Sequence, residues 1–417
     1  MGSKKKRSGT YTGRGRDTDR KPLKPADHKA TGGKQSEWER AFWRWGAASL
    51  IMGVLFLVYN FHPYYMRLQF TPWRPFYNIA FVTWLVLGIP YAVVTLRKFG
   101  GQRMNFNDGA VHWLLFFRGL FFWVFERCRF PSHVWNNRRM RVAALSLGVK
   151  AFFTPLMTIF MAEHTGRIVE MWFRRKGVTP PTPDRLNQMW QQGWDGWYPF
   201  VADVVPKVVP NFNGILDGLF TFTARDYWWW AGWAYQWLFF LDTIWALTGY
   251  AVESRWLNNK TKSVEPTLFG WMVALMCYPP FNDVSGTYFP LSRNGQWQII
   301  TDETALILCN FLMTAAFCVY VWATLAFGPT FSNLTNRGII TRGPYAVIRH
   351  PAYACKNFAW WMEYLPYCGG FHNVLALVAW NTIYGLRAWT EERHLSKDPE
   401  YLAYKKKVRW AAIPGIF

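Results

Sequence analysis

Long apolar runs alternate with short polar or basic segments over most of the 417-residue chain. An α-helix needs roughly 20 apolar residues to cross the hydrocarbon core of a bilayer, and only helices or closed barrels satisfy every backbone polar group there. The pattern predicts an all-α, polytopic membrane helical bundle of about eight spans, one of them a half-helix or a short, tilted span. The predicted spans are residues 41–61, 76–96, 142–161, 227–251, 267–278 (the short one), 304–327, 352–367 and 371–390.

A further run, residues 111–125, is strongly apolar but short, and Arg118 lies in its middle. A helix that lies in the membrane interface fits this run better than a span does. Single polar residues occur inside three predicted spans, at Lys150, Asp242 and Asn310. We expect them to form interhelical hydrogen bonds.

Composition divides the chain into five parts. Residues 1–38 form a basic tail with few large aliphatic side chains, which we expect to be disordered and cytoplasmic. N-terminal membrane helices follow over 39–162. A Trp- and Pro-rich segment, 163–226, is typical of an extramembrane or interfacial insertion with short helices. Central membrane helices and a polar loop occupy 227–335, and residues 336–417 carry the candidate chemistry.

Charge and aromatic content favour a membrane partner. Hydrophobic residues make up 51% of the chain, and there are 27 Trp, a residue that gathers where a bilayer meets water. The net charge of +22 resides mainly in the tail and short loops rather than on one folded module, which favours an anionic membrane surface and argues against nucleic acid. The even span count, the basic tail and Lys405–Lys407 predict that both termini are cytoplasmic. No Cys pair or His/Cys cluster predicts a metal site.

The last two predicted spans carry polar residues at helical spacing, and Cys368-Gly369-Gly370 between them predicts a tight turn and antiparallel neighbours. Ionisable groups at membrane depth usually face a bundle interior or a wet cavity, so the two stripes predict a pocket. Structural ion pairing is the alternative: Arg387 and Glu391 lie one turn apart, whereas Lys356 and Glu363 would pair with other helices. The stripes are Tyr353, Lys356, Trp360, Glu363 and Tyr367 on the first helix, and Tyr384, Arg387, Glu391 and Leu395 on the second.

An ordered set of motifs surrounds this helix pair. Gly343-Pro344-Tyr345, Arg349-His350-Pro351 and Tyr353 match a G-x-Y…R-H-P-x-Y element. The second half matches E-E-x-x-L…Y-x-x-Y…P, with Glu391, Glu392, Leu395, Tyr401, Tyr404 and Pro414. In this order the motifs resemble the catalytic part of isoprenylcysteine carboxyl methyltransferases and their bacterial relatives, over roughly the last quarter of the chain.

The resemblance implies that residues 336–417 bind S-adenosylmethionine and that a lipophilic methyl acceptor enters from the lipid. Carboxylates and aromatic faces stabilise the sulfonium cation of this cofactor. Arg349 or Arg387 could hold the carboxylate of the cofactor or of the acceptor in bidentate fashion. By this resemblance the candidate catalytic residues are Arg387 and Glu391, and the candidate cofactor-binding residues are Tyr345, Arg349, His350, Pro351, Tyr353 and Glu392.

Cys355-Lys356-Asn357 occupies a place where members of that family often have a small residue or Gly. Lys356 in a pocket wall indicates an acceptor with an anionic group, and the candidate substrate-binding residues are Lys356, Trp360 and Glu363. The expected acceptor is a carboxylate or a lipid headgroup. Two alternatives stay open: an NADPH-dependent, sterol-reductase-like enzyme, because such proteins share a related C-terminal half, and a non-catalytic membrane scaffold.

Overall fold

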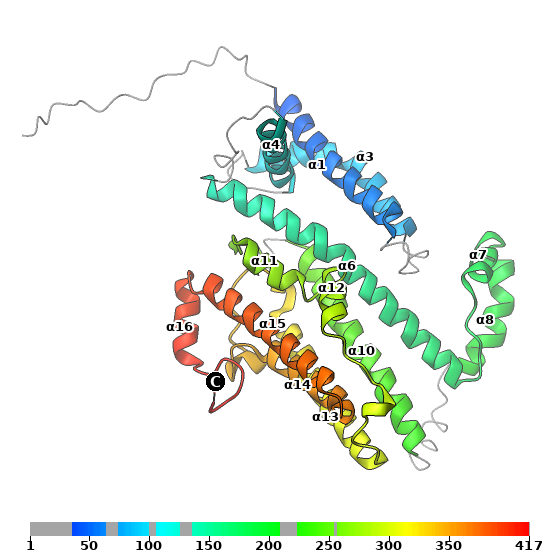
Figure 1. The fold of residues 1–417 in the computed structure, drawn as a ribbon. Helices are drawn as coiled ribbons and strands as arrows, with labels where there is room; N and C mark the ends of the chain where they lie inside the picture. Colours follow the sequence, from blue (N-terminus) through cyan, green and yellow to red (C-terminus); the bar gives the residue numbers. More distant parts are fainter. Residues whose placement is uncertain are drawn as a thin grey trace, which may run out of the picture.

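The computed structural model describes residues 36–63, 74–99, 106–125, 136–208, 223–253 and 257–416, and these form thirteen α-helices with one two-stranded ribbon. The helices pack in layers that run roughly side by side (Figure 1). The mostly helical class predicted from the apolar pattern is confirmed. The predicted disorder of residues 1–38 concerns a tail that lies almost entirely outside the described residues.

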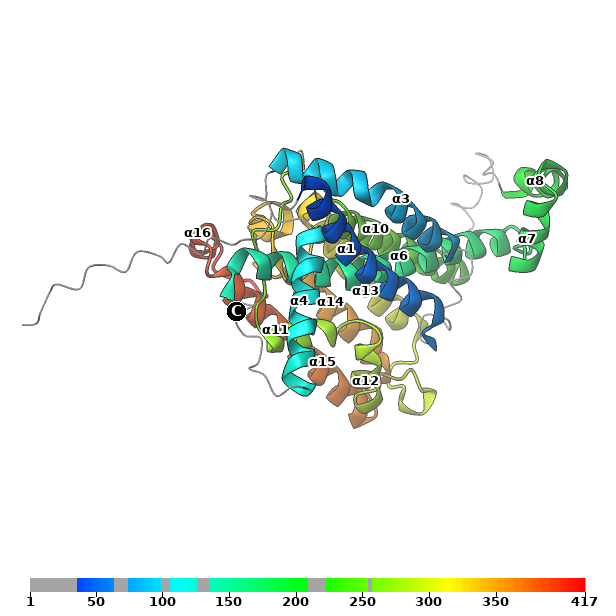
Figure 2. The same cartoon turned by 90° about the horizontal axis from the view of Figure 1, so that it is seen from above.

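The N-terminal layer consists of α1 (Glu37–Phe61), α3 (Arg74–Phe99) and α4 (Phe106–Phe125). α1 begins at a capping box in which the Ser36 hydroxyl accepts from the Glu39 backbone N–H and the Glu39 side chain accepts from the Ser36 N–H. α4 contacts both α1 and α6 and runs across their direction (Figures 1 and 2). This orientation is compatible with the predicted interfacial helix at 111–125, which stays a prediction.

The middle of the molecule is built from α6 (Arg138–Arg175) and α10 (Ala224–Ala251), which lie side by side. Phe153 of α6 stacks on Tyr250 of α10 with ring centroids 4.9 Å apart, in the centre of an apolar cluster. The Asp226 side chain at the start of α10 accepts from the Thr223 N–H and hydroxyl. These bonds and the ion pair with Arg175 lower the pKa of Asp226 to about 2.

α6 is longer than the sequence predicts, because the span expected to end at Met161 continues to Arg175. Contacts with α10 support the extra turns: His164 Nδ1 lies 2.8 Å from Gln236 Oε1, and the Trp172 ring packs near Trp233. The sequence division between residues 162 and 163 therefore falls inside one continuous helix. The predicted insertion contributes two short helices, α7 (Pro183–Gln191) and α8 (Trp194–Val208), which project away from the bundle (Figure 1).

Two short helices precede the closing bundle. α11 (Leu268–Leu275) is too short to cross a membrane as a regular helix, and the place of residues 267–278 in a bilayer stays a prediction. α12 (Phe281–Tyr288) occupies the first part of a segment predicted as a polar loop. The strand β1 (Ser263–Val264) pairs antiparallel with β2 (Thr335–Asn336), which fixes the segment before α11 against the segment after α13.

The closing bundle contains α13 (Glu303–Phe327), α14 (Pro351–Tyr364), α15 (Phe371–Leu395) and the short α16 (Pro399–Lys407). α14 contacts both α13 and α15, and the turn at Cys368–Gly370 separates α14 from α15 as predicted. The Asp398 side chain caps α16 by accepting from the Glu400 N–H at 3.0 Å. This arrangement brings the two predicted polar stripes into one bundle.

By length and composition, three described helical segments suffice to cross a membrane: Trp38–Phe61, Arg138–Arg175 and Glu303–Thr330. Two shorter apolar stretches are Phe81–Val94 and Gly109–Phe125. The predicted count of about eight spans and the side on which the termini lie stay predictions.

Two of the three polar residues predicted to form interhelical hydrogen bonds, Asp242 and Asn310, do so, whereas Lys150 pairs with a residue beyond the end of a helix. Asp242 accepts hydrogen bonds from the Tyr320 hydroxyl at 2.8 Å and the Thr324 hydroxyl at 2.7 Å. Asn310 Oδ1 accepts from the Tyr227 hydroxyl at 3.0 Å. Lys150 Nζ lies 2.6 Å from Glu253, just beyond the end of α10. Such bonds satisfy polar groups that would be costly in an apolar surrounding.

Candidate functional site

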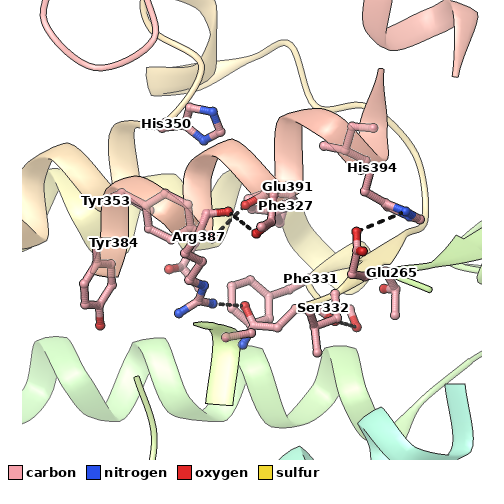
Figure 3. Close-up of a pocket in the computed structure, with 18 of the residues that line it drawn as sticks. Glu265, Phe327, Phe331, Ser332, His350, Tyr353, Tyr384, Arg387, Glu391 and His394 are labelled. Carbon is pink, nitrogen blue, oxygen red and sulfur yellow. Dashed lines mark hydrogen bonds and ion pairs between the residues drawn. The ribbon is translucent and has the colours of Figure 1, made fainter. Parts of the chain in front are cut away.

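A cavity lies between α13, α14 and α15, and it is closed on one side by residues 331–335 and by Glu265 (Figure 3). Both predicted polar stripes reach it, since Tyr353 and Lys356 come from α14 and Tyr384 and Arg387 from α15. The candidate residues that line the cavity are Tyr345, Arg349, His350, Tyr353, Lys356, Arg387 and Glu391. Residues predicted from two motifs more than 30 positions apart therefore share one wall.

The Arg387 guanidinium lies in the middle of this cavity among tyrosine rings (Figure 3). It lies 5.3 Å from the ring centroid of Tyr278, 5.1 Å from Tyr353 and 5.9 Å from Tyr384. Arg387 Nη2 donates to Asn333 Oδ1 at 2.5 Å. The predicted pair with Glu391 does not form, and within the described part of the chain the buried Arg387 has no carboxylate partner at ion-pair distance.

Glu391 instead accepts a hydrogen bond from the Tyr353 hydroxyl at 2.7 Å. The Tyr353 ring stacks against the His350 ring, with centroids 5.6 Å apart. A carboxylate and two aromatic faces thus stand next to one another on the cavity wall. A cation between them would be stabilised by charge and by the ring quadrupoles.

Lys356 forms a second cationic position in the cavity. Its ammonium lies 5.3 Å from the Tyr320 centroid, 5.7 Å from Trp360 and 5.9 Å from Tyr384. Tyr320 also donates to the buried Asp242 side chain, so the Asp242 carboxyl group lies at the hydroxyl end of the ring near Lys356. The predicted pairing of Lys356 with a carboxylate of another helix is not observed among the described residues.

Glu392 lies behind the cavity wall rather than on it. Its Oε1 accepts from Arg349 Nε at 2.7 Å and lies 3.2 Å from His350 Nε2, and its Oε2 accepts from Lys405 Nζ at 2.5 Å. Burial disfavours the charged form, but the bonds from His350, Lys405 and Arg349 outweigh it and lower the pKa of Glu392. The structure thus places Glu392, predicted as a cofactor contact, as a group that positions Arg349 and His350.

A backbone clasp (residues 349–350 with residues 408–411) closes the same end of the site. The N–H of Arg349 donates to the Trp410 carbonyl at 3.0 Å, and the N–H of His350 donates to the Ala411 carbonyl at 2.8 Å. Arg349 Nη1 donates to the Val408 carbonyl at 2.9 Å. These bonds hold the loop before α14 and therefore fix the direction in which its side chains enter the cavity.

Three further candidate residues, like Glu392, do not line the cavity. Pro351 begins α14, where its missing N–H costs nothing. Trp360 packs against the Tyr384 ring with centroids 5.2 Å apart and supports it from behind. Glu363 forms an ion pair with Arg293, which lies in the loop between α12 and α13 rather than on another helix as predicted. The α14 stripe therefore divides into a cavity-facing part and a packing part.

A buried acid and a buried histidine of the cavity, Glu265 and His394, were not among the candidates from the sequence (Figure 3). Glu265 follows β1, and nothing in its local pattern marks it, because its place beside α15 depends on the pairing of β1 with β2. His394 follows Glu391 by three positions and so lies on the same helix face. That spacing was the one signal available in the sequence.

Comparison with known proteins adds no relative: no protein-family model, no curated protein and no solved structure matches this chain. The resemblance of the last quarter therefore depends on the motif residues alone.

Proposed function

We propose that this chain is an integral membrane methyltransferase that uses S-adenosylmethionine and transfers its methyl group to a lipophilic acceptor with a carboxylate. The observation that carries the proposal is Arg387, a buried cation in a cavity, surrounded by tyrosine rings and without a carboxylate partner in the described chain. A buried charge without a partner is costly. An anionic ligand group would compensate it.

The wall beside Arg387 supports a ligand that also carries positive charge. Glu391 and the faces of Tyr353 and His350 form a site for a cation next to the site for an anion. S-adenosylmethionine has a sulfonium, an ammonium and a carboxylate, so the donor and acceptor set fits it. Lys356 lines the same cavity and provides a second cation, so Lys356 and Arg387 together can hold the anionic group of an acidic acceptor.

When bound, S-adenosylmethionine supplies a methyl group whose bond to sulfur breaks with its electron pair on sulfur, while an acceptor carboxylate oxygen forms the new bond to carbon. Charge is neutralised in this step, so a dry pocket favours it. Arg387 and Lys356 orient the acceptor carboxylate, and the rings around them exclude water. Glu391 and Tyr353 hold the cationic side of the cofactor in line with it.

Binding to the purified full-length protein tests the proposal. We expect S-adenosylmethionine and S-adenosylhomocysteine to bind by calorimetry, and His350→Ala to weaken both because His350 lines the cavity and stacks on Tyr353. Incubation with labelled S-adenosylmethionine and a membrane lipid extract should place the label in the apolar fraction. Mild base should release that label as methanol, as from a methyl ester.

His372→Ala is a matched control, because His372 lies at the other end of α15 against Trp297 and not in the cavity. It should bind both ligands as the natural protein does. Tight binding of NADPH without S-adenosylmethionine would instead support a reductase. Binding of neither would support a membrane scaffold and contradict the proposal.

A further inference from the structure

At the end of the cavity away from Tyr384, two buried polar atoms face each other without hydrogen-bond partners (Figure 3). They are Glu265 Oε2 and His394 Nδ1, which lie 3.6 Å apart. The side chains are 4% and 7% exposed, respectively. Since 3.6 Å exceeds hydrogen-bond length, the two atoms do not satisfy each other, and buried polar atoms normally have partners.

The remaining polar atoms of both side chains are held in place. Glu265 Oε1 accepts from Arg393 Nη2 at 2.8 Å and from the Thr267 N–H at 3.1 Å. His394 Nε2 lies 3.1 Å from the Ser263 hydroxyl. The two unsatisfied atoms therefore keep a fixed spacing and direction, and both residues line the cavity. Such a pre-oriented pair of atoms is a binding subsite for a ligand group.

Charge limits which group completes the subsite. Arg393 already balances the carboxylate of Glu265. Burial lowers the pKa of His394, although the charge of Glu265 opposes this, so the imidazole is neutral near pH 7. The missing partner is therefore a neutral hydrogen-bond donor, and a hydroxyl fits because it donates to Glu265 and also bonds to a histidine nitrogen.

Two adjacent hydroxyls would satisfy both atoms at once. A carboxylate is the side chain that dinucleotide-binding proteins place on a ribose hydroxyl. We propose that Glu265 Oε2 and His394 Nδ1 bind the ribose diol of the nucleoside ligand. This inference rests on the proposed function, because S-adenosylmethionine carries such a ribose. It assigns the nucleoside to the Glu265 end and leaves the Arg387 and Lys356 end for the acceptor.

Ligand analogues test the subsite without altering the protein. Binding of S-adenosylhomocysteine to the full-length protein is compared with binding of its 2′-deoxy and 3′-deoxy forms. We expect removal of the hydroxyl that faces Glu265 to weaken binding about 10- to 100-fold, the range for a hydrogen bond to a charged group. Glu265→Gln should weaken the binding of S-adenosylhomocysteine by a similar factor. This variant should bind S-adenosylhomocysteine and the deoxy form without that hydroxyl equally well.

Glu253→Gln is the matched control, because Glu253 is also partly buried in an ion pair, with Lys150, but does not line the cavity. It should keep the full discrimination between hydroxyl and deoxy ligands. Equal binding of all three ligands to the natural protein would overturn the ribose assignment and leave the proposed function standing. Absence of S-adenosylhomocysteine binding would overturn both.

Discussion

The N-terminal layer and the closing bundle both expose apolar side chains, but they differ in what they bury. In α1, α3 and α4 several apolar side chains are strongly exposed: Phe61 is 68% exposed, Val86 67% and Phe125 71%. In the closing bundle Arg387 and His350 point inward and are buried. An outer apolar face is costly in water and normal in lipid. The exposed apolar side chains of the N-terminal layer thus suit contact with lipid, whereas the buried polar groups of the closing bundle line a cavity.

The interiors of the two regions differ as well. Small residues make the contacts of the N-terminal layer: Ala41, Ala48, Ala92 and Ala110 are completely buried. Small side chains let helices approach closely, as is usual inside membranes. Tyrosines surround the cavity of the closing bundle instead, with Tyr353 and Tyr384 beside Arg387. The close packing of the N-terminal layer leaves little space between its helices. The tyrosine rings of the closing bundle line a cavity and present hydroxyl groups as well as apolar faces to it.

Removal of the central cation should have the largest effect. We expect Arg387→Met to lower methyl transfer on the order of 100-fold, because a buried charge that binds an anion is lost. Arg387→Lys should lose on the order of 10-fold, since it keeps the charge but not the planar fork. Initial rates with labelled cofactor measure both. Unchanged rates in Arg387→Met would show that the cavity is not the reaction site.

Loss of the Glu392 carboxylate should lower the stability of the closing bundle. Glu392→Gln removes a charge that holds Arg349, His350 and Lys405, and we expect a loss of about 2 kcal/mol in unfolding free energy. Thermal unfolding in detergent measures this. Glu363→Gln serves as the comparison, because its partner Arg293 is 58% exposed. This substitution should lower the unfolding free energy by less than about 1 kcal/mol. Equal losses would contradict a special role for Glu392.

Acidification should act through Glu392 too. Its pKa is lower in the folded than in the unfolded chain, so the unfolded chain takes up the proton first as the pH falls. The stabilisation is complete above the ordinary glutamate pKa of about 4.3 and is lost progressively below it. Unfolding midpoints between pH 7 and pH 3 should fall less in Glu392→Gln than in the natural chain. Parallel curves would refute this assignment.

Changes on the outer face should have the smallest effect. Phe121 of α4 is 55% exposed, so Phe121→Ala should leave S-adenosylhomocysteine binding within about twofold of the natural value. Calorimetry on the two proteins in the same detergent checks this. A large loss of affinity would mean that the N-terminal layer contributes to the ligand site, and the contrast between the two regions would fail.

The sequence predicted most long helices because the signal for them is local. The apolar runs at 227–251 and 304–327 end where α10 and α13 end. The prediction from sequence failed where contacts with a distant segment determine whether, or how far, a segment is helical. α6 continues to Arg175 because α10 lies beside it, and residues 281–288 become helical in a segment with few apolar residues.

The same distinction applies to the site. Motifs and helical spacing placed Tyr353, Lys356, Arg387 and Glu391 on one wall. Spacing alone does not tell which of two neighbouring carboxylates faces inward: Glu391 lines the cavity, whereas Glu392 bonds to Arg349 and Lys405 behind its wall. Glu265 became visible only through the pairing of β1 with β2. Long-range strand pairing of this kind produces no periodic pattern in the sequence from which it could be predicted.

The backbone clasp between residues 349–350 and 408–411 has a consequence for biosynthesis. Translation must pass Trp410 and Ala411 before the loop that leads into α14 can be fastened. A nascent chain that ends just short of these residues has every described helix but lacks the carbonyls that hold the loop before α14. Proteolytic cleavage just ahead of Trp410 would likewise release this loop and leave the described helices intact.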